Sequence, residues 1–294
     1  MALTLADAAK LSNDLVLQGV IETVVKDSDV LRFLPFIDVV GNALTYNREN
    51  AAATAGFFAV GDTWTESAPT ITQVQSSLVI LGGDADVDNY IRQTRSNVQD
   101  IEAAILQLKA KAVKDKFEDT FINGDITADA KAFDGLKRLV PSGQQVEMAT
   151  NGATLTLAKL DEMVDKVMGG KPELLLMSKR SRRKLKGLRY ATTSALEEGL
   201  DQFGSRVNFY YGIPIAISDW QSDAETQGSS TDCSSIYAFS LGEGALAGLT
   251  NAGIQLERIG SLETKDATRT RIKWYCSLAL FSTIKAARLL GVRD

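Results

Sequence analysis

The most informative stretch of the chain runs from Thr45 to Ser77 and reads TYNRENAAATAGFFAVGDTWTESAPTITQVQSS. Turn-forming residues at Gly61 and Pro69 precede a strand-like segment at 70–81. This pattern predicts a long two-stranded ribbon. The stretch is poor in charge, and its charged residues are Arg48, Glu49, Asp62 and Glu66.

The predicted ribbon carries aromatic side chains that its own strands cannot bury. Phe57, Phe58 and Trp64 do not alternate in a way that would gather them in one local core. A lone hairpin is marginal in water and needs a packing partner, and low charge with exposed aromatic residues is typical of the centre of a subunit interface. Two interpretations stay open: an ordinary hairpin folded onto its own domain, or an arm that becomes stable only against neighbouring copies. In the second, we expect inter-subunit contacts from Arg48, Glu49, Phe57, Phe58, Trp64 and Glu66.

The composition excludes several classes of protein. The chain has 294 residues, of which 45% are hydrophobic and 23% charged, as in soluble globular proteins. It contains no histidine, which excludes Ser-His and Cys-His catalysis and His-ligated metals. The net charge of −5 argues against a basic nucleic-acid binder. We expect no catalytic residues, no cofactor and no bound metal.

The cysteines and the N-terminus indicate where the protein resides. Cys233 and Cys276 lie far apart and outside any CxxC pattern, which favours buried thiols in a reducing compartment over a disulfide. The first residues, from Met1 to Asp7, lack the basic region and the apolar stretch of a signal peptide. No apolar run approaches the roughly 18 residues that would cross a bilayer. We therefore expect an intracellular, soluble protein with no membrane contact.

Helices and strands are mixed along the chain without a βαβ repeat, which indicates an α+β fold. Residues 1–44 are expected to form an N-terminal arm with one or two helices, the second ended by Pro35. A capping-box pattern at Ser96 opens an amphipathic helix over 96–123, which Gly124 ends. The apolar stripe of this helix is expected at Val98, Ile101, Ile105, Leu108, Ala112, Phe117 and Phe121. Another helix is expected over 157–168, and strands over 173–177, 212–219, 236–241, 254–259 and 269–284. For the last of these segments, a turn into a helix stays open as an alternative.

A strongly basic helix is expected directly after the strand at 173–177. Of its eleven residues 179–189, seven are basic and none is acidic. Because the net charge of the whole chain is −5, the rest of the chain has a net charge of −12. One interpretation is a phosphate-binding stripe. We favour a solvated helix that pairs with acidic surface on the same or an adjacent subunit, because no aromatic residue interrupts the run before Tyr190. The basic residues of this candidate contact helix are Lys179, Arg180, Arg182, Arg183, Lys184, Lys186 and Arg189.

No pattern in the chain indicates catalysis. The alternating Asp84, Asp86 and Asp88 lack the glycine and the glutamate that a calcium loop needs at its sixth and twelfth positions, so they predict a polar strand face or turn. The glycine-rich segment 242–248 lacks the helix-opening context of a dinucleotide-binding turn and predicts a turn between strands. Two Ser-x-x-Lys matches have no supporting motifs.

Several segments in order carry a resemblance to a known family. They are Gly-Asp-x-Trp-x-Glu at 61–66, the helix end from Phe117 to Asp125, and Phe133-Asp-Gly-Leu136. Gly212-Ile-Pro-Ile, Arg269-x-Arg271 and the segment 286–290 look similar too. In pattern and order, over nearly the whole length, the chain resembles the major capsid protein of tailed bacteriophages, with the Hong Kong 97-type fold.

The resemblance implies an architecture and a function. Residues 1–44 would be the N-terminal arm, and 45–83 the extended loop that reaches over the next subunit. Residues 84–171 and 251–294 would form a peripheral domain with a spine helix at 96–123, and 172–250 an axial domain. Hexamers and pentamers would close into an icosahedral shell around double-stranded DNA. The protein would belong to the virion and assemble in the cytoplasm of a host bacterium. It would work with a portal protein, with a separate scaffolding protein or none, and with or without decoration proteins.

The chain differs from some members of this family in two respects, and three other functions stay open. Some relatives crosslink subunits through a lysine of the extended loop, but this chain has no lysine between Lys26 and Lys109, so we expect a non-covalent shell. Other relatives carry a long N-terminal scaffold segment; because this sequence goes from Met1 almost directly into the arm, we expect no such segment here. The alternatives are an encapsulin-type shell around cargo enzymes, an enzyme that uses carboxylates and lysines, and a nucleic-acid-binding protein that uses residues 179–189.

Overall fold

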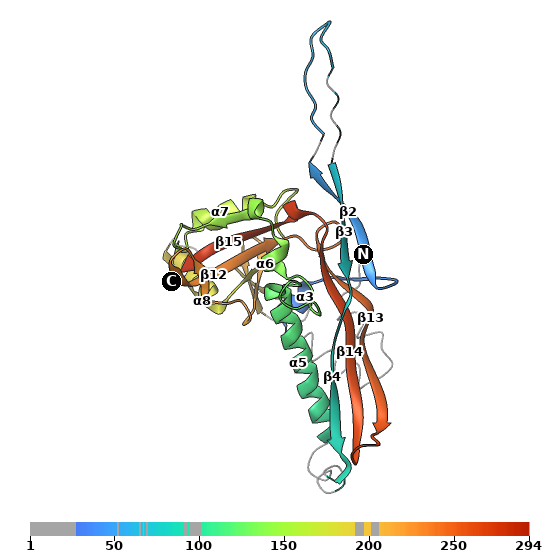
Figure 1. Ribbon diagram of the computed structural model, residues 1–294. Helices are drawn as coiled ribbons and strands as arrows, with labels where there is room; N and C mark the ends of the chain where they lie inside the picture. The colour runs from blue at the N-terminus through green and yellow to red at the C-terminus, as the bar shows by residue number, and fades with distance from the viewer. Residues whose placement is uncertain are drawn as a thin grey trace.

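The computed structural model describes residues 28–51, 53–64, 66, 68, 70–90, 93, 101–191, 197–200 and 206–293. They form a body of two parts from which a thin ribbon projects (Figure 1). The predicted first helix of the N-terminal arm and the predicted capping box at Ser96 lie outside the described residues.

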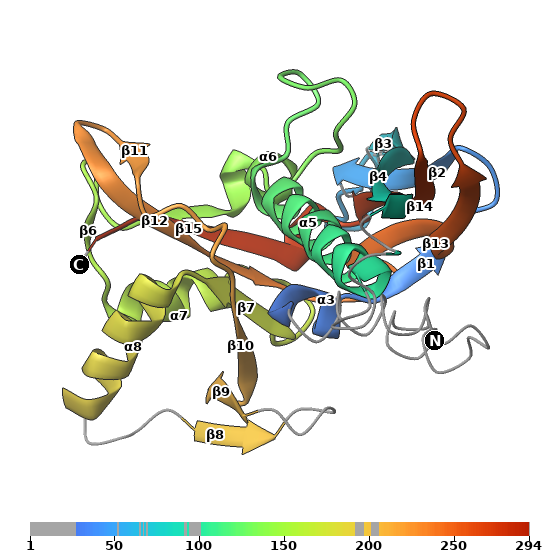
Figure 2. The same ribbon diagram turned by 90° about the horizontal axis from the view of Figure 1, so that it is seen from below.

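The first part of the body is built on a nine-stranded sheet. Its elements are β5 Gln145–Glu147, β6 Ala153–Thr154, β7 Leu174–Met177, β8 Glu197–Leu200, β9 Arg206–Tyr210, β10 Ile213–Ile217, β11 Glu225–Gln227, β12 Ser230–Phe239 and β15 Ala286–Arg293, with helices α7 Leu157–Asp165 and α8 Lys179–Ala191. The main path runs β5-β15-β12-β7-β10-β9-β8, and β11 and β6 pair with β12 and β15. Both helices pack on the same face, through Leu160, Met163 and Leu185 (Figure 2). All four residues of β7 are buried, as is usual for a strand covered on both faces.

The second part is a four-stranded sheet covered on one face by a long helix. The sheet runs in the order β1-β13-β14-β4. Its elements are β1 Phe36–Asp38, β4 Val79–Asp88, β13 Leu246–Ser261, β14 Ala267–Leu280 and the helix α5 Ile101–Asn123. The helix ends before Gly124, as predicted, and a Cβ at that position would press on the carbonyl oxygens of Thr120 and Phe133. Short helices α3 Asp29–Phe33 and α6 Leu136–Leu139 flank α5, and α3 ends before Pro35 as predicted.

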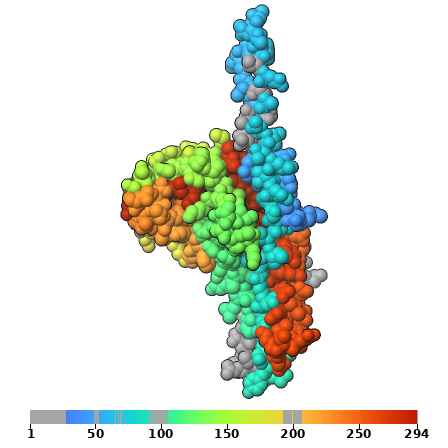
Figure 3. All heavy atoms as spheres, in the orientation of Figure 1, coloured from blue at the N-terminus to red at the C-terminus, as the bar shows by residue number. Residues whose placement is uncertain are grey.

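The ribbon is a separate two-stranded sheet, as the sequence predicts. It consists of β2 Ala43–Ala51 and β3 Thr70–Ser77, which are antiparallel. The single strand expected over 70–81 divides at Leu78, because β4 begins at Val79 and pairs with β14 instead. The space-filling view shows the end of the ribbon standing clear of the body (Figure 3).

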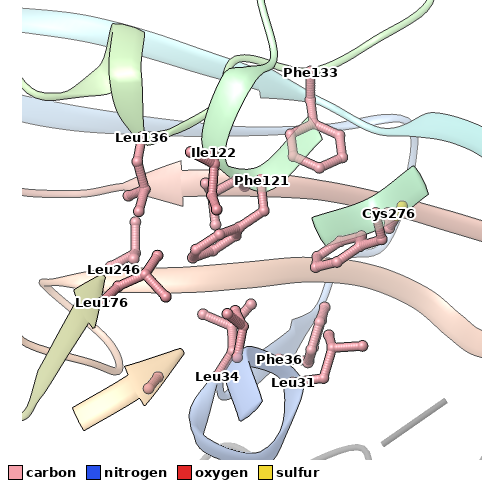
Figure 4. Close-up of a cluster of buried hydrophobic side chains, with 14 of the residues drawn as sticks. Leu31, Leu34, Phe36, Phe121, Ile122, Phe133, Leu136, Leu176, Leu246 and Cys276 are labelled. Carbon is pink, nitrogen blue, oxygen red and sulfur yellow. The ribbon is translucent and has the colours of Figure 1, made fainter. Parts of the chain in front are cut away.

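One apolar cluster joins the two parts of the body. Trp274 of β14 is fully buried, with its ring centroid 4.7 Å from that of Phe117 on α5 and 5.4 Å from that of Phe36. One turn further along α5, Phe121 lies edge-on to Phe239 of the nine-stranded sheet. Figure 4 shows this junction, where side chains from α3, α5, α6 and both sheets converge. Large buried aromatic residues of this kind dominate the energetics of a core.

The apolar stripe predicted for α5 is partly wrong. Phe117 and Phe121 are buried as predicted, but Leu108 is 70% exposed and Ala112 is exposed as well. The buried side chains that precede Phe117 are Leu106, Ala110 and Val113. Apolar residues occupy several faces of the first turns of this helix, so spacing alone does not choose among them. The buried face continues the phenylalanines backward with steps of four or three residues, through Val113 and Ala110 to Leu106.

The two sheets group the chain differently from the expected domain boundaries. Residues 145–154 and 286–293 fall in the segments assigned to the peripheral domain, yet their strands pair within the nine-stranded sheet. Helix α7 packs on that same sheet.

Both cysteines are buried free thiols, as predicted. Among the described residues, no helix is long and apolar enough to span a membrane.

A ladder of ion pairs covers the face of the four-stranded sheet that α5 leaves open. Asp84 and Asp86 alternate with buried residues along β4, which confirms the predicted polar strand face. Arg269 donates to Asp86 through two nitrogens at 2.6 and 2.8 Å, and Arg271 donates to Asp84 at 2.6 and 2.9 Å. Paired, bidentate contacts of this kind hold neighbouring strands in register.

We expect this ladder to weaken in acid. The hydrogen bonds from Arg271 and Arg269 hold the pKa values of Asp84 and Asp86 below the ordinary range. Such carboxylates stabilise the fold above the ordinary carboxyl pKa of about 3.9, and lose that contribution as the pH falls through the lowered value. The variant Asp84→Asn/Asp86→Asn should therefore unfold at lower urea than the unmodified chain at pH 7, with a difference that shrinks below about pH 4.

The matched control for this experiment is Asp165→Asn, at the exposed end of α7. It should follow the unmodified chain at every pH. A difference between the double variant and the unmodified chain that is the same at pH 7 and at about pH 3 would contradict the assignment to titrating carboxylates.

Candidate assembly surface

The ribbon is attached to the body at its base. The Tyr46 hydroxyl donates to the carbonyl oxygen of Leu280 at 3.2 Å, and its ring centroid lies 4.8 Å from that of Phe281. Nε of Arg48 donates to the carbonyl of Phe281 at 3.3 Å, and Nη2 donates to that of Leu280. A small apolar cluster around Leu249 packs beneath these contacts. Arg48, which we predicted to contact another subunit, binds carbonyls of its own chain here.

The contacts of Arg48 should decide how firmly the ribbon is held. In Arg48→Met, two carbonyl oxygens lose a charged donor, and such hydrogen bonds contribute about 1.5–3 kcal/mol each. We expect amide hydrogen exchange in β2 and β3 to become at least about tenfold faster. The amides of β7, in the other sheet, serve as the internal control and should not change. Equal acceleration in β7 would mean that the whole subunit has been destabilised.

The far end of the ribbon presents apolar side chains to solvent. Phe57 and Val60 are fully exposed and Trp64 is 76% exposed. Phe58 is half-buried, and stacks on Trp64 with ring centroids 4.5 Å apart. The base of the ribbon is therefore attached to its own domain, but its far end is not folded onto that domain, which was one of the two interpretations left open. Exposed aromatic residues in a segment of low charge are typical of surfaces that bind another protein.

The other predicted ribbon residues lie along its length. Glu49 pairs with Ile71 across the two strands, and Glu66 is exposed near the far end. Sequence reasoning missed the exposed Val60 and Ile71, although both belong to the low-charge stretch. It also missed Tyr46, whose role depends on a carbonyl that is 234 residues away in sequence.

The predicted basic helix exists as α8, and two of its acidic partners lie in the same chain. Nζ of Lys179 donates to Asp219 at 2.7 Å, and Arg180 pairs with Asp223 at 3.4 Å. Arg189 is buried. Of the remaining basic residues of the helix, Arg183 and Lys186 are exposed, and Arg182 and Lys184 are half-buried.

A groove between α5, α3 and the first turn of α8 is lined by charges of both signs. Burial raises the pKa of Glu118, and the hydroxyl of Ser28 opposes this by hydrogen bonding. Lys114 pairs with Asp115 at 3.0 Å. The lining residues are Asp29, Lys111, Lys114, Asp115, Glu118, Lys179, Ile217, Asp219 and Trp220. Within the part of the chain that the structure describes, no group of three or more Cys, Asp or Glu residues could hold a metal ion.

The fold is the mixed α/β, Hong Kong 97-like capsid fold. The chain aligns with the holo-SrpI encapsulin complex from Synechococcus elongatus PCC 7942 at a TM-score of 0.70 and 19% identity, over 99% of this chain and 96% of that chain. It aligns with the capsid of a native GTA particle at a TM-score of 0.65 and 12% identity, over 92% of this chain and 91% of that chain. A chain of Microbacterium phage Oxtober96 aligns at a TM-score of 0.64 and 16% identity, over 91% of both chains.

The sequence itself identifies the family. A family model described as the SU10 major capsid protein matches residues 60–226, which is more than half of the chain. The chain belongs to this family. It is a major capsid protein, a structural component of the icosahedral shell of a virion and not an enzyme. No curated protein matches the chain. The family match favours a virion shell over the encapsulin alternative.

Proposed function

We propose that the ribbon is the arm by which each subunit of the shell overlaps the next. The observation that carries this proposal is the exposure of Phe57, Val60 and Trp64 at the end of a ribbon that stands clear of its own body. Water is a poor solvent for such side chains, and a neighbouring subunit supplies the missing packing partner. The residues of this contact surface are Glu49, Phe57, Phe58, Trp64 and Glu66, with Arg48 holding its base.

The subunits are arranged in hexamers and pentamers. In this proposal the N-terminal arm is residues 1–44, of which Phe36–Asp38 pair as β1 with β13 of the four-stranded sheet, and residues 45–83 include the overlapping loop. The peripheral domain is built on α5 and the four-stranded sheet, and the axial domain on the nine-stranded sheet. The pairing of β5, β6 and β15 with that sheet supports adding residues 145–154 and 286–293 to the axial segment 172–250.

The shell encloses double-stranded DNA without recognising its sequence. The net charge of −5 supports this, because a strongly basic inner wall would adsorb DNA through counterion release and hinder its movement during filling. In this proposal the portal is a separate protein, and any scaffolding or decoration protein is separate as well.

The shell is held together without covalent bonds between subunits. The ribbon contains no lysine, and none occurs between Lys26 and Lys109, so an isopeptide bond cannot start there. We expect purified shells to dissociate completely when boiled in denaturant, and to give a single band at the mass of the subunit. A ladder of slowly migrating multimers would contradict this prediction.

Electron microscopy of the purified protein tests the proposal. Closed shells with overlapping ribbons at every subunit boundary would support it, and density for packed DNA would identify the contents. A stable monomer or small dimer at all concentrations would contradict the function. Shells whose ribbons lie free of the neighbouring subunit would contradict the role of the arm.

A further inference from the structure

The turn between β9 and β10 holds an aromatic residue in an unusual backbone conformation. Tyr211 has a φ of 50° and Gly212 a φ of 78°, so both central residues of this hairpin turn have positive φ. Glycine, asparagine and aspartate are the usual residues at such positions. A bulky side chain there is a strained outlier, which persists only where its surroundings hold it.

Contacts from three directions hold this turn in place. The ring of Tyr211 lies 4.7 Å from that of Tyr210, and the guanidinium carbon of Arg189 lies 5.1 Å from the centroid of Tyr211 and 5.7 Å from that of Tyr210. The hydroxyl of Tyr210 donates to Asp161 at 2.6 Å, and Lys171 donates to the carbonyl of Tyr211 at 3.4 Å. Despite these contacts, Tyr211 is 52% exposed. It is a rigid aromatic side chain directed at solvent.

The second half of α8 continues this surface. Nζ of Lys186 lies 5.6 Å from the ring centroid of Tyr190, and both side chains are exposed. A hollow lies beside them over Gly187, with Lys184 on its rim. The acids that pair with Lys179 and Arg180 lie at the first turn of the helix, and Arg189 is buried against the two tyrosines. The exposed Lys186 and the half-buried Lys184 therefore supply the positive charge of this surface.

We propose that this aromatic and basic surface, formed by Tyr211, Tyr190 and the second half of α8, docks on an acidic surface of a neighbouring copy of the chain. The inference rests on the proposed shell function and adds a second contact, on the nine-stranded sheet and separate from the ribbon. Tyrosine and arginine are the residues that most often carry the energy of an interface, and rigid side chains lose little entropy on binding.

Charge complementarity identifies the occupant. Residues 179–189 carry seven positive charges and no negative charge, and the rest of the chain carries −12. Lys179 and Arg180 pair with acids of their own chain and Arg189 is buried, so the charge offered to a neighbour is that of Lys184 and Lys186. Because the rest of each copy is acidic, these two lysines are attracted to a neighbouring copy. Double-stranded DNA is the other polyanion that such a surface could bind, and the experiment below separates the two.

Two variants test the proposal by electron microscopy and size-exclusion chromatography of the purified protein across a concentration series. Tyr211→Gly removes the ring but suits the positive φ, so the subunit should stay folded. Lys184→Glu/Lys186→Glu reverses the charge, and its matched control is Lys184→Arg/Lys186→Arg. We expect the control to assemble like the unmodified chain, and each test variant to need at least about tenfold more protein to form shells. Thermal unfolding of the dissociated subunits should be similar in all of them.

The outcomes are distinct. Normal assembly of both test variants would overturn the docking surface while leaving the shell function intact. Normal shells that have lost their DNA would assign the surface to DNA and also overturn the proposal. If the unmodified chain forms no shells, the proposed function fails instead. If Tyr211→Gly changes thermal stability but not assembly, Tyr211 serves only the fold of the turn.

Discussion

Replacing residues 52–69 by the two-residue turn Asn-Gly should abolish shell formation and leave a folded subunit. The described side chains at the far end of the ribbon are mostly exposed, so their removal takes little from the core. Asn-Gly suits a two-residue hairpin turn that would close the shortened β2–β3 ribbon. We expect the free energy of unfolding of the subunit to change by less than about 1 kcal/mol. Electron microscopy should find no closed particles.

A point variant with a control makes the same test without shortening the chain. Phe57→Ser/Trp64→Ser removes apolar area at the end of the ribbon only. Val40→Ser is the control, because Val40 is also fully exposed but lies in a bend outside the ribbon. Assembly should fail in the first variant and persist in the second. Normal shells from the double variant would mean that the ribbon's aromatic residues do not carry the overlap.

Removing the acid from the buried ion pair of the nine-stranded sheet should destabilise the subunit severely. Arg288 and Glu225 lie 3.0 Å apart, with side chains only 7% and 8% exposed. The hydroxyl of Ser235 donates to the same carboxylate, and Arg288 donates to that hydroxyl. In Glu225→Gln, the guanidinium stays buried without its counter-charge, which costs about 3–5 kcal/mol. Urea unfolding of the dissociated subunit measures this loss.

The double variant Glu225→Leu/Arg288→Met is the informative comparison. It removes both charges and replaces them with apolar side chains, and such replacements are often neutral or stabilising. We expect it to recover most of the stability lost in Glu225→Gln. A double variant that is at least as unstable as the single one would show that packing or the hydrogen bonds of Ser235 matter more than the unpaired charge.

Local signals in the sequence predict the elements better than their partners. The apolar run at 174–177 and the glycine at the end of α5 are read from a few adjacent residues, and both predictions are confirmed. The pairing of β15 with β5 and β6 depends on contacts more than a hundred residues apart, for which no local pattern exists. The prediction of the buried face of α5 was partly wrong for a related reason. That face is fixed by the packing of Phe117 against Trp274, which lies more than a hundred residues later in the sequence.

The residues of the candidate assembly surface also fall into those that local sequence predicts and those that depend on distant contacts. Low charge and unpaired aromatic residues predict the exposed end of the ribbon, and Phe57 and Trp64 are exposed there. The role of Arg48 could not be predicted, because its acceptors at Leu280 and Phe281 come from another strand. Tyr211 had a faint signal in the Tyr-Gly pair before a strand, but the sequence does not reveal that Arg189 approaches it.

The attachment of the ribbon has a mechanical consequence. Tyr46 and Arg48 hold on to Leu280 and Phe281, at the point where the chain leaves β14 and crosses toward β15. This is the junction between the two sheets, so we expect the direction of the ribbon to depend on the angle between them. A change of that angle should displace the far end of the ribbon more than its base.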